Sequence, residues 1–220
     1  MCTRYISPDQ AEIERLWHIG RHNQPQWARD VFPRASGPFI RLGQAGGCHL
    51  VVGIWGLVPS WSTTPVLKYA TCNCRSEEAA AKPTFRDAWR HGQRCIIPAA
   101  SFDEPCWETG KNVWWRFRRL DGQPWGLAGL WNTWVDRATG EVVESYTMLT
   151  VNADAHPLMS RMHKPDSKLP ADQQDKRSVV AIEPADVEQW LQGKADEAAE
   201  LLAPPALALI GASPVKGNAD

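Results

Sequence analysis

The stretch RCIIPAASFDEPCW, residues 94–107, is the most informative part of the sequence for both architecture and chemistry. Its first part, RCIIPA, is a short apolar run with a proline near its end, which is typical of a buried strand. The run leads to Asp103 and Glu104, which stand beside Phe102 and Trp107. A carboxyl group held against aromatic rings tends to have a raised pKa, which suits proton transfer near neutral pH. A carboxylate in a solvated loop is the alternative interpretation.

Hydrophobic patterning on both sides of this stretch predicts the remaining elements. Alternation and short apolar runs predict strands over residues 38–42, 48–58, 112–120, 124–135, 141–152 and 178–182. Helical spacing predicts helices over residues 8–19, 76–91, 184–193 and, for a short one, about 153–162. Strands intermixed with peripheral helices predict a single α+β domain.

Length and composition are those of a globular protein. The chain has 220 residues, 43% of them hydrophobic and 22% charged, which is enough for one well-buried core. No apolar run approaches the roughly 18 residues that span a bilayer, and no secretory signal is recognisable. We therefore expect a cytoplasmic protein that does not contact membranes, with its six cysteines as free thiols.

Charge and tryptophan content restrict the kind of partner. The net charge of −1 excludes a globally basic nucleic-acid coat, so any DNA contact requires a local basic patch. The 12 tryptophans are expected to fill the core, and some of them to offer stacking surfaces for bases. Residues 1–200 are expected to form the domain, and the Ala- and Pro-rich residues 201–220 a tail with a mobile end.

The chain begins MCTRY, which places a cysteine directly behind the initiator methionine. Methionine aminopeptidases remove Met1 when the next residue is small, so we expect Cys2 to be the mature N-terminus. Its α-amine and thiol could attack an aldehyde in turn and close a five-membered ring. An α-amine has a pKa of roughly 7.7–8.0, so a usable neutral fraction exists at physiological pH. A chance cysteine at position 2 is the alternative.

Basic residues surround a polar Asn73 in the segment 71–95. They are His91 and the arginines Arg75, Arg86, Arg90 and Arg94. A solvated helix face is the alternative to a binding surface. A zinc site on Cys72 and Cys74 would need a second ligand pair, which the sequence lacks, so no metal is predicted.

Two histidines stand in the segment 150–165. His156 and His163 are seven positions apart and would share one face of a helix that ran through both. Pro157 fits the first turn of such a helix. Either imidazole could complete a carboxyl–imidazole pair with the acid-bearing segment, and a structural histidine is the alternative.

Five segments occur in an order that resembles one known family. They are MCTRY at 1–5, WGLVPSW at 55–61, NCRSEE at 73–78, RCIIPAASFDEPCW at 94–107 and GLAGLW at 126–131. Together they resemble the SRAP family, the SOS response-associated peptidase-like proteins, which include sensors of abasic sites in single-stranded DNA. The similarity runs from residue 1 to about residue 192.

The resemblance implies a compact α+β fold around a curved, mostly antiparallel, barrel-like sheet with peripheral helices. It also implies an enzyme of the DNA-damage (SOS) response whose N-terminal cysteine forms a thiazolidine with the ring-opened sugar of an abasic site. The product is a covalent DNA–protein crosslink. The expected partner is single-stranded DNA with abasic sites, bound by a monomer that uses no cofactor.

Catalytic roles follow from the same resemblance. Cys2 matches the nucleophile, Asn73 the asparagine that orients the reacting terminus and sugar, and Glu104 the acid that transfers protons. The family's IHxRMP segment matches poorly, and its histidine is assigned to His163, with His156 in reserve. A carboxyl–imidazole pair would accept and return the protons of Schiff-base formation.

A DNA-binding surface is implied as well. Arg4 and Arg75 match basic residues expected near phosphates, and Trp61 lies where family members place an aromatic side chain beside the DNA. Arg86 and Arg90 add positive charge in the same part of the sequence. These five residues form the predicted DNA contact.

Two departures from the family pattern lie next to the expected reactive residues, and two other functions stay open. Thr3 stands where the family has glycine, and Pro105 replaces the aromatic residue after the acid. An N-terminal-nucleophile cysteine peptidase that acts on itself or on a peptide would use the same Cys2. A single-stranded DNA-binding protein with a weakened site is the third possibility.

Overall fold

A closed barrel of five strands forms the centre of the computed structural model, which describes residues 2–20, 24–43 and 46–215. The barrel order is β10-β4-β3-β6-β9, and β9 pairs back with β10. These strands are β3 (Ser36–Leu42), β4 (Cys48–Trp55), β6 (Arg94–Ala99), β9 (Trp125–Val135) and β10 (Val142–Asn152). Two short strands extend from β10, namely β5 (Asn73–Arg75) and β11 (Arg177–Val179).

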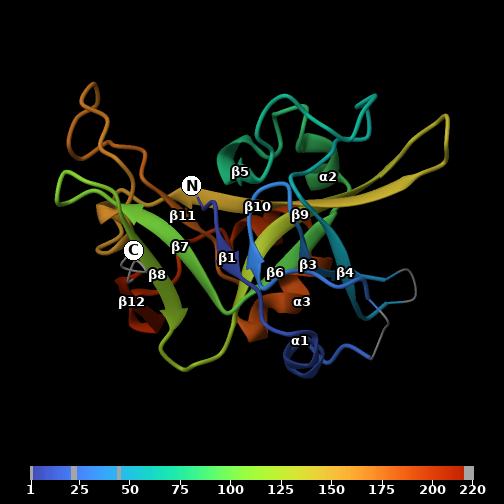
Figure 1. Cartoon of the computed structure of the whole chain (residues 1–220), viewed down its shortest axis with the longest axis horizontal. Helices are drawn as coiled ribbons and strands as arrows, with labels where there is room; N and C mark the ends of the chain where they lie inside the picture. Colours follow the sequence, from blue (N-terminus) through green and yellow to red (C-terminus); the bar gives the residue numbers. More distant parts are fainter. Residues whose placement is uncertain (1, 21–23, 44–45, 216–220) are drawn as a thin grey trace, which may run out of the picture.

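A second sheet of five strands lies against the barrel (Figure 1). Its order is β12-β8-β7-β1-β2, and every pair in it is antiparallel. The strands are β1 (Tyr5–Ile6), β2 (Asp30–Val31), β7 (Ser101–Cys106), β8 (Val113–Arg119) and β12 (Ile210–Pro214). In the barrel sheet β10 pairs in parallel with β4 and β5, and the other pairs are antiparallel. The prediction of an α+β fold with a mostly antiparallel, barrel-like sheet is confirmed.

Strand alternation divides the apolar side chains into two clusters. Neighbouring side chains of a strand point to opposite faces, so Phe39 and Ile97 belong to one cluster while Ile40 and Ile96 belong to the other. The first cluster also contains Cys2 and side chains from β7 and β8, and therefore joins the two sheets. The second is covered by helices.

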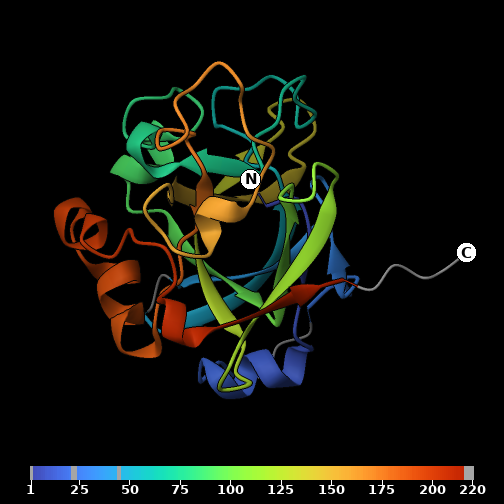
Figure 2. The same cartoon turned by 90° about the vertical axis from the view of Figure 1, so that its left-hand side faces the viewer.

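The helices are short and lie at the periphery (Figures 1 and 2). They are α1 (Gln10–Leu16), α2 (Arg86–Arg90), α3 (Val187–Gln192) and α4 (Ala195–Ala199). Single 3-10 turns occupy Ser76–Glu78, Met159–Arg161, Pro184–Asp186 and Leu207–Leu209. Ile13 and Trp190 are fully buried where α1 and α3 cover the second cluster. Within the described ranges, no helix is long and apolar enough to cross a bilayer.

Two expected helices are largely absent. Residues 76–91 contain one 3-10 turn and the five-residue α2 rather than a continuous helix. Pro83 lies between the two, where its ring disfavours helical geometry in the preceding residue. Residues 153–162 contain only a 3-10 turn, so no helix runs through both His156 and His163.

The structure adds strands that hydrophobic patterning did not predict. They are the two-residue β1 and β2, the three-residue β5, and the longer β7 and β12. β7 carries Asp103 and Glu104, so neither acid lies in a solvated loop. β12 pairs with β8 and places part of the Ala- and Pro-rich segment in a sheet. The domain boundary at residue 200 stays a prediction, and the expected mobile end at 216–220 lies outside the described residues.

Candidate functional site

Strand β1 fixes the N-terminal segment between β2 and β7. Tyr5 is in register with Val31 on one side and with Phe102 on the other. Cys2 therefore lies beside β7, and its side chain is fully buried in the cluster that joins the two sheets. Its thiol donates a hydrogen bond of 3.3 Å to the carbonyl oxygen of Arg4.

Asn73 holds the backbone of Cys2. It lies in β5, which pairs in parallel with β10, and its Nδ2 atom donates a 2.7 Å hydrogen bond to the carbonyl oxygen of Cys2. The Oδ1 atom of Asn73 is buried and accepts no hydrogen bond from any described residue. An unused buried acceptor is uncommon, which marks this amide as a place where a further donor would be stabilised.

Successive side chains of β7 point to opposite faces of the sheet, so Asp103 and Glu104 lie on opposite faces. Glu104 is 1% exposed, and its Oε2 atom lies 2.8 Å from the Nε2 atom of His163. Asp103 is also 1% exposed, but it accepts two 2.8 Å hydrogen bonds from Arg116. It also forms an ion pair with Arg4 at 3.2 Å. Asp103 is therefore engaged by two guanidinium groups, while Glu104 faces an imidazole with which it can exchange a proton.

The backbone of His163 is held in an unusual conformation. Its φ angle is +63°, which a residue with a Cβ atom adopts only at a cost of about 1–2 kcal/mol. Its N–H donates to the carbonyl oxygen of Pro105, and its own carbonyl oxygen accepts from the Nζ atom of Lys176, both at 2.6 Å. Backbone strain of this kind persists where surrounding contacts enforce it and often occurs at functional sites.

Electrostatics link Glu104 to the thiol of Cys2. Burial raises the pKa of Cys2 well above its ordinary value, and the negative charge of Glu104 raises that pKa further. Because burial and Glu104 both raise this pKa, the Cys2 thiol keeps its proton at neutral pH. A nearby base is therefore needed to form the nucleophilic thiolate. Glu104 and His163 together can act as that base.

The predicted DNA-contacting residues differ in their surroundings. Arg4 pairs with Asp30 at 2.5 Å, and Arg75 pairs with Asp175 at 2.5 Å. Trp61 is 51% exposed, and its indole N–H donates to the carbonyl oxygen of Pro83.

The other two predicted DNA contacts lie together on α2. Arg86 pairs with Asp87 at 3.5 Å, and Arg90 is exposed at the end of the helix. Arg4 lies in the N-terminal segment close to Cys2, whereas Arg86 and Arg90 lie on helix α2.

His156 occupies a different environment from His163. Its Nδ1 atom accepts hydrogen bonds from the backbone N–H groups of Leu158 and Met159, and its Nε2 atom lies 3.0 Å from the carbonyl oxygen of Pro205. Both ring nitrogens are therefore used to hold the turn that starts at Met159. The structure brings His163, and not His156, to the predicted acid.

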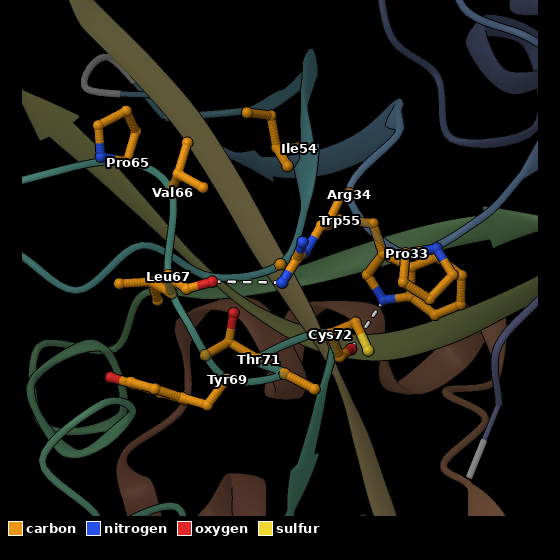
Figure 3. A pocket seen from close by; sticks show the side chains of 12 residues that line it. Pro33, Arg34, Ile54, Trp55, Pro65, Val66, Leu67, Tyr69, Thr71 and Cys72 are labelled. Carbon is orange, nitrogen blue, oxygen red and sulfur yellow. Dashed lines mark hydrogen bonds between the residues drawn. The ribbon is translucent and has the colours of Figure 1, made fainter.

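Two neighbouring cavities lie near the residues that contact the N-terminal segment. One of about 190 Å³ is lined by Trp55, Tyr69 and Cys72, among others (Figure 3). The indole N–H of Trp55 donates to the carbonyl oxygen of Cys72, as the dashed line at Cys72 shows (Figure 3). A second cavity of about 420 Å³ is lined by Thr3, Arg4, Phe32, Pro33 and Trp114.

The two cavities share one lining residue, Pro33, so they belong to one stretch of surface. A third cavity of about 450 Å³ opens beside His163 and Lys176. Across the described ranges, no group of three or more His, Cys, Asp or Glu side chains is arranged to hold a metal ion.

The sequence as a whole matches one protein family. Residues 1–218 match the family described as SOS response associated peptidase (SRAP). The chain belongs to the SRAP family.

This SRAP chain is similar in sequence to two curated proteins. The abasic site processing protein HMCES of Gallus gallus is 27% identical over 176 residues, which cover 61% of this chain and 51% of that protein. The abasic site processing protein YedK of Escherichia coli (strain K12) is 34% identical over 106 residues, covering 48% of this chain and 45% of that protein. The matched part thus spans about half the length of each relative.

Solved structures share the fold of this chain over nearly its whole length. A crystal structure of a protein from Bordetella bronchiseptica superposes with a TM-score of 0.86 at 36% identity and covers 98% of this chain and 100% of its own. A crystal structure from Bacteroides thetaiotaomicron has a TM-score of 0.77 at 21% identity and covers 99% of this chain and 93% of its own. The second match supports the fold alone.

Sequence reasoning missed three contributors to the site of this SRAP protein. Lys176 stands in a polar segment of the sequence, yet its Nζ atom donates to the carbonyl oxygen of His163 and the residue is 6% exposed. Arg116 and Trp114 were assigned only to a strand. Their signal was present, because period-two alternation along 113–119 places Trp114 and Arg116 on one face.

Proposed function

We propose that this SRAP protein captures abasic sites in single-stranded DNA as a covalent crosslink through Cys2, once the residue before it has been removed. The observation that carries the proposal is the convergence of Cys2, Asn73, Glu104 and His163 from four separate parts of the chain. The names of the curated relatives, both abasic site processing proteins, support the substrate class.

The reaction consumes one aldehyde and releases one water. The α-amine of Cys2 adds to the C1′ aldehyde of the ring-opened sugar, and the resulting carbinolamine loses water to give an imine. The thiol sulfur then adds to the imine carbon while the thiol proton passes to the nitrogen, which closes a thiazolidine. No oxidant or metal is needed for this sequence.

Each polar group of the site has a place in this scheme. Asn73 fixes the Cys2 carbonyl, and its buried Oδ1 atom can accept a hydrogen bond from the reacting amine. Glu104 and His163 supply the proton acceptor and donor that carbinolamine dehydration and thiol addition require. A base is needed because the pKa of the buried thiol is raised.

The DNA would lie across the surface that contains both cavities beside the N-terminal segment. Arg4 lines one of these cavities and could bind a DNA phosphate if it gave up its ion pair with either Asp30 or Asp103. Since the lesion lacks a base, neighbouring nucleotides must be held by stacking and backbone contacts. The exposed ring of Tyr69 is one stacking surface on the Cys72 side.

The test is incubation with single-stranded DNA that carries one abasic site, followed by denaturing gel and intact mass. We expect an adduct with the mass of protein plus DNA minus one water, located on the Cys2 peptide. Cys2→Ser protein should give none, and DNA with a tetrahydrofuran analogue, which has no aldehyde, is the matched control. Absence of any adduct from protein whose mass shows an N-terminal Cys2 would overturn the proposal.

Peptide hydrolysis is a second candidate, favoured by the word peptidase in the family's description. It would use the same thiol, activated by the same acid–base pair, against a carbonyl carbon. The measurement that separates the two is turnover of a peptide library by protein that crosslinks DNA. Cleavage lost in both Cys2→Ser and Glu104→Gln proteins would support a peptidase, and no cleavage by the native protein would exclude it.

A further inference from the structure

Two exposed aromatic side chains lie beside the N-terminal segment and take no part in the acid–base pair. Phe32 directly follows β2 and is 48% exposed, and Trp114 lies in β8 and is 40% exposed. Both line the 420 Å³ cavity whose other lining residues are Thr3, Arg4 and Pro33. Aromatic rings left in contact with solvent around a cavity are typical of a ligand-binding surface.

Strand register places this cavity over one face of the second sheet. Asp103 is paired in register with Arg116, and Trp114 is two residues before Arg116, so both side chains lie on the face that Asp103 occupies. Arg4 joins the same face through its ion pair with Asp103. The guanidinium of Arg4 lies over the ring of Phe32, 5.6 Å from its centroid.

We propose that Phe32 and Trp114 hold the nucleobase next to the abasic site, stacked on their rings in this cavity. The proposal rests on the proposed function and adds a base-binding subsite on the Thr3–Arg4 side of Cys2. Its ligand class is the nucleobase of single-stranded DNA, bound through its π face and therefore with little sequence preference.

Distance along the chain supports this occupant. Consecutive Cα atoms are about 3.8 Å apart, so the Cα atom of Arg4 lies within about 8 Å of that of Cys2. A DNA strand attached through one sugar at Cys2 would have its next nucleotide within reach of Thr3 and Arg4. The cavity therefore begins at Thr3, the residue next to the proposed point of attachment.

The chemistry of the lining also fits a nucleotide. Single-stranded nucleic acids are held by aromatic rings interleaved with cationic groups, and the cavity combines Phe32 and Trp114 with Arg4. Arg116 lies on the same face. The two guanidinium groups can approach the phosphate of the stacked nucleotide.

Strand pairing explains why Trp114 is available for stacking. Its cross-strand neighbour is Pro105, the residue that replaces the aromatic side chain of the SRAP sequence pattern. The indole of Trp114 thus supplies an aromatic ring from the adjacent strand at the same level of the sheet. In this chain we therefore expect the stacking role to belong to β8.

The test uses fluorescence, so that it does not depend on covalent chemistry. Cys2→Ser protein is titrated with short single-stranded DNA that carries a tetrahydrofuran site and 2-aminopurine on its 5′ or its 3′ side. Stacking quenches 2-aminopurine, so we expect quenching for one of the two placements. Adding Trp114→Ala or Phe32→Ala should remove the quenching and weaken binding about tenfold.

Leu120→Ala is the matched control, because Leu120 is 68% exposed directly after the end of β8 and outside the cavity lining. The Leu120→Ala protein should quench 2-aminopurine and bind the DNA like the Cys2→Ser parent. Melting temperatures should show that all variants fold. Equal quenching in the Trp114→Ala, Phe32→Ala and parent proteins, or no quenching with either placement, would overturn the subsite.

The crosslinking assay separates this proposal from the function on which it rests. Crosslinking by native protein, together with quenching that does not depend on Phe32 or Trp114, leaves the function and removes the subsite. Quenching that depends on Phe32 and Trp114, without any crosslink from native protein, leaves the subsite as a feature of DNA binding alone.

Discussion

The Nε2 atom of His163 lies 2.8 Å from the Oε2 atom of Glu104, although the two residues are 59 positions apart in the chain. Glu104 lies in the middle of β7, and His163 follows the 3-10 turn Met159–Arg161. The hydrogen bond from the His163 backbone N–H to the Pro105 carbonyl oxygen holds this turn against β7. The imidazole and the carboxyl group therefore form one unit beside Cys2.

If the pair acts as one proton-transfer unit, its two members should not contribute independently. We expect Glu104→Gln and His163→Ala each to slow crosslinking about 100-fold, and the double variant to be no slower than the worse single one. His91→Ala changes an exposed histidine outside the site, so it is the control and should crosslink at the native rate. Multiplicative losses in the double variant, measured from initial rates, would show that the two residues act separately.

The positive φ angle of His163 predicts that two variants differ in stability although both lose reactivity. His163→Gly should be more stable than His163→Ala by about 1 kcal/mol, because glycine adopts this conformation without a Cβ penalty. Both should crosslink slowly, since both lack the imidazole. Urea unfolding of the two variants provides the comparison, and equal midpoints would indicate that the backbone carries no strain.

Asp103 should matter for stability, in contrast to the role proposed for Glu104. Asp103→Asn leaves the guanidinium groups of Arg116 and Arg4 without their shared buried carboxylate, so we expect a loss of about 2 kcal/mol in the free energy of unfolding. Asp30→Asn breaks an exposed pair with Arg4 and should cost less than about 0.5 kcal/mol. Similar losses in urea unfolding would contradict the buried network.

Lys176 should position His163 without touching the substrate. Lys176→Met keeps the apolar stem but removes the ammonium group that binds the His163 carbonyl, so crosslinking should slow about tenfold while the protein stays folded. Lys168→Met, in the exposed part of the same segment, should leave the rate unchanged. A native rate for Lys176→Met would remove Lys176 from this role.

Two buried phenols should make the fold sensitive to alkali. Tyr5 and Tyr146 share a 2.6 Å hydrogen bond, and burial raises the pKa of each above its ordinary value of about 10. A pKa raised in the folded state means that stability is full below about pH 10 and is lost as pH rises further, because only the unfolded chain releases these protons there. The slope is up to about 1.4 kcal/mol per pH unit for each group.

Urea midpoints between about pH 9 and pH 11 provide the measurement. Tyr146→Phe should start from a lower midpoint, since Tyr5 loses its partner, and should then fall less steeply than the native protein. Gly37 is part of the same arrangement, because a Cβ atom there would lie 2.4 Å from both hydroxyl oxygens. Parallel pH profiles for the native and Tyr146→Phe proteins would contradict the assignment.

The sequence predicted the long strands because each carries its own apolar pattern, whereas the elements that build the site are defined by pairing. β1 and β2 have two residues each and β5 has three, which is too short for any periodicity. The resemblance to SRAP proteins supplied Cys2, Asn73 and Glu104 from motifs. It left two histidines open, because their positions depend on a loop that no local rule describes.

Buried polar pairs were equally hidden from sequence reasoning. Nothing in the order of residues says that Asp103 faces Arg116 while Glu104 faces His163, until the register of β7 with β8 is known. The burial of Lys176 has the same origin, since its ammonium group binds the carbonyl oxygen of His163, 13 positions away in the chain. Long-range contacts of this kind decide chemistry without leaving a local signature.

The position of β1 between β2 and β7 has a consequence for the order of events during synthesis. β1 cannot be enclosed until β7, ending at Cys106, has left the ribosome. At about 5–20 residues per second, the first residues stay accessible for roughly 5–20 s after they appear. Any enzyme that must cut the peptide bond ahead of Cys2 has this interval in which to act, before the nascent chain closes over the thiol.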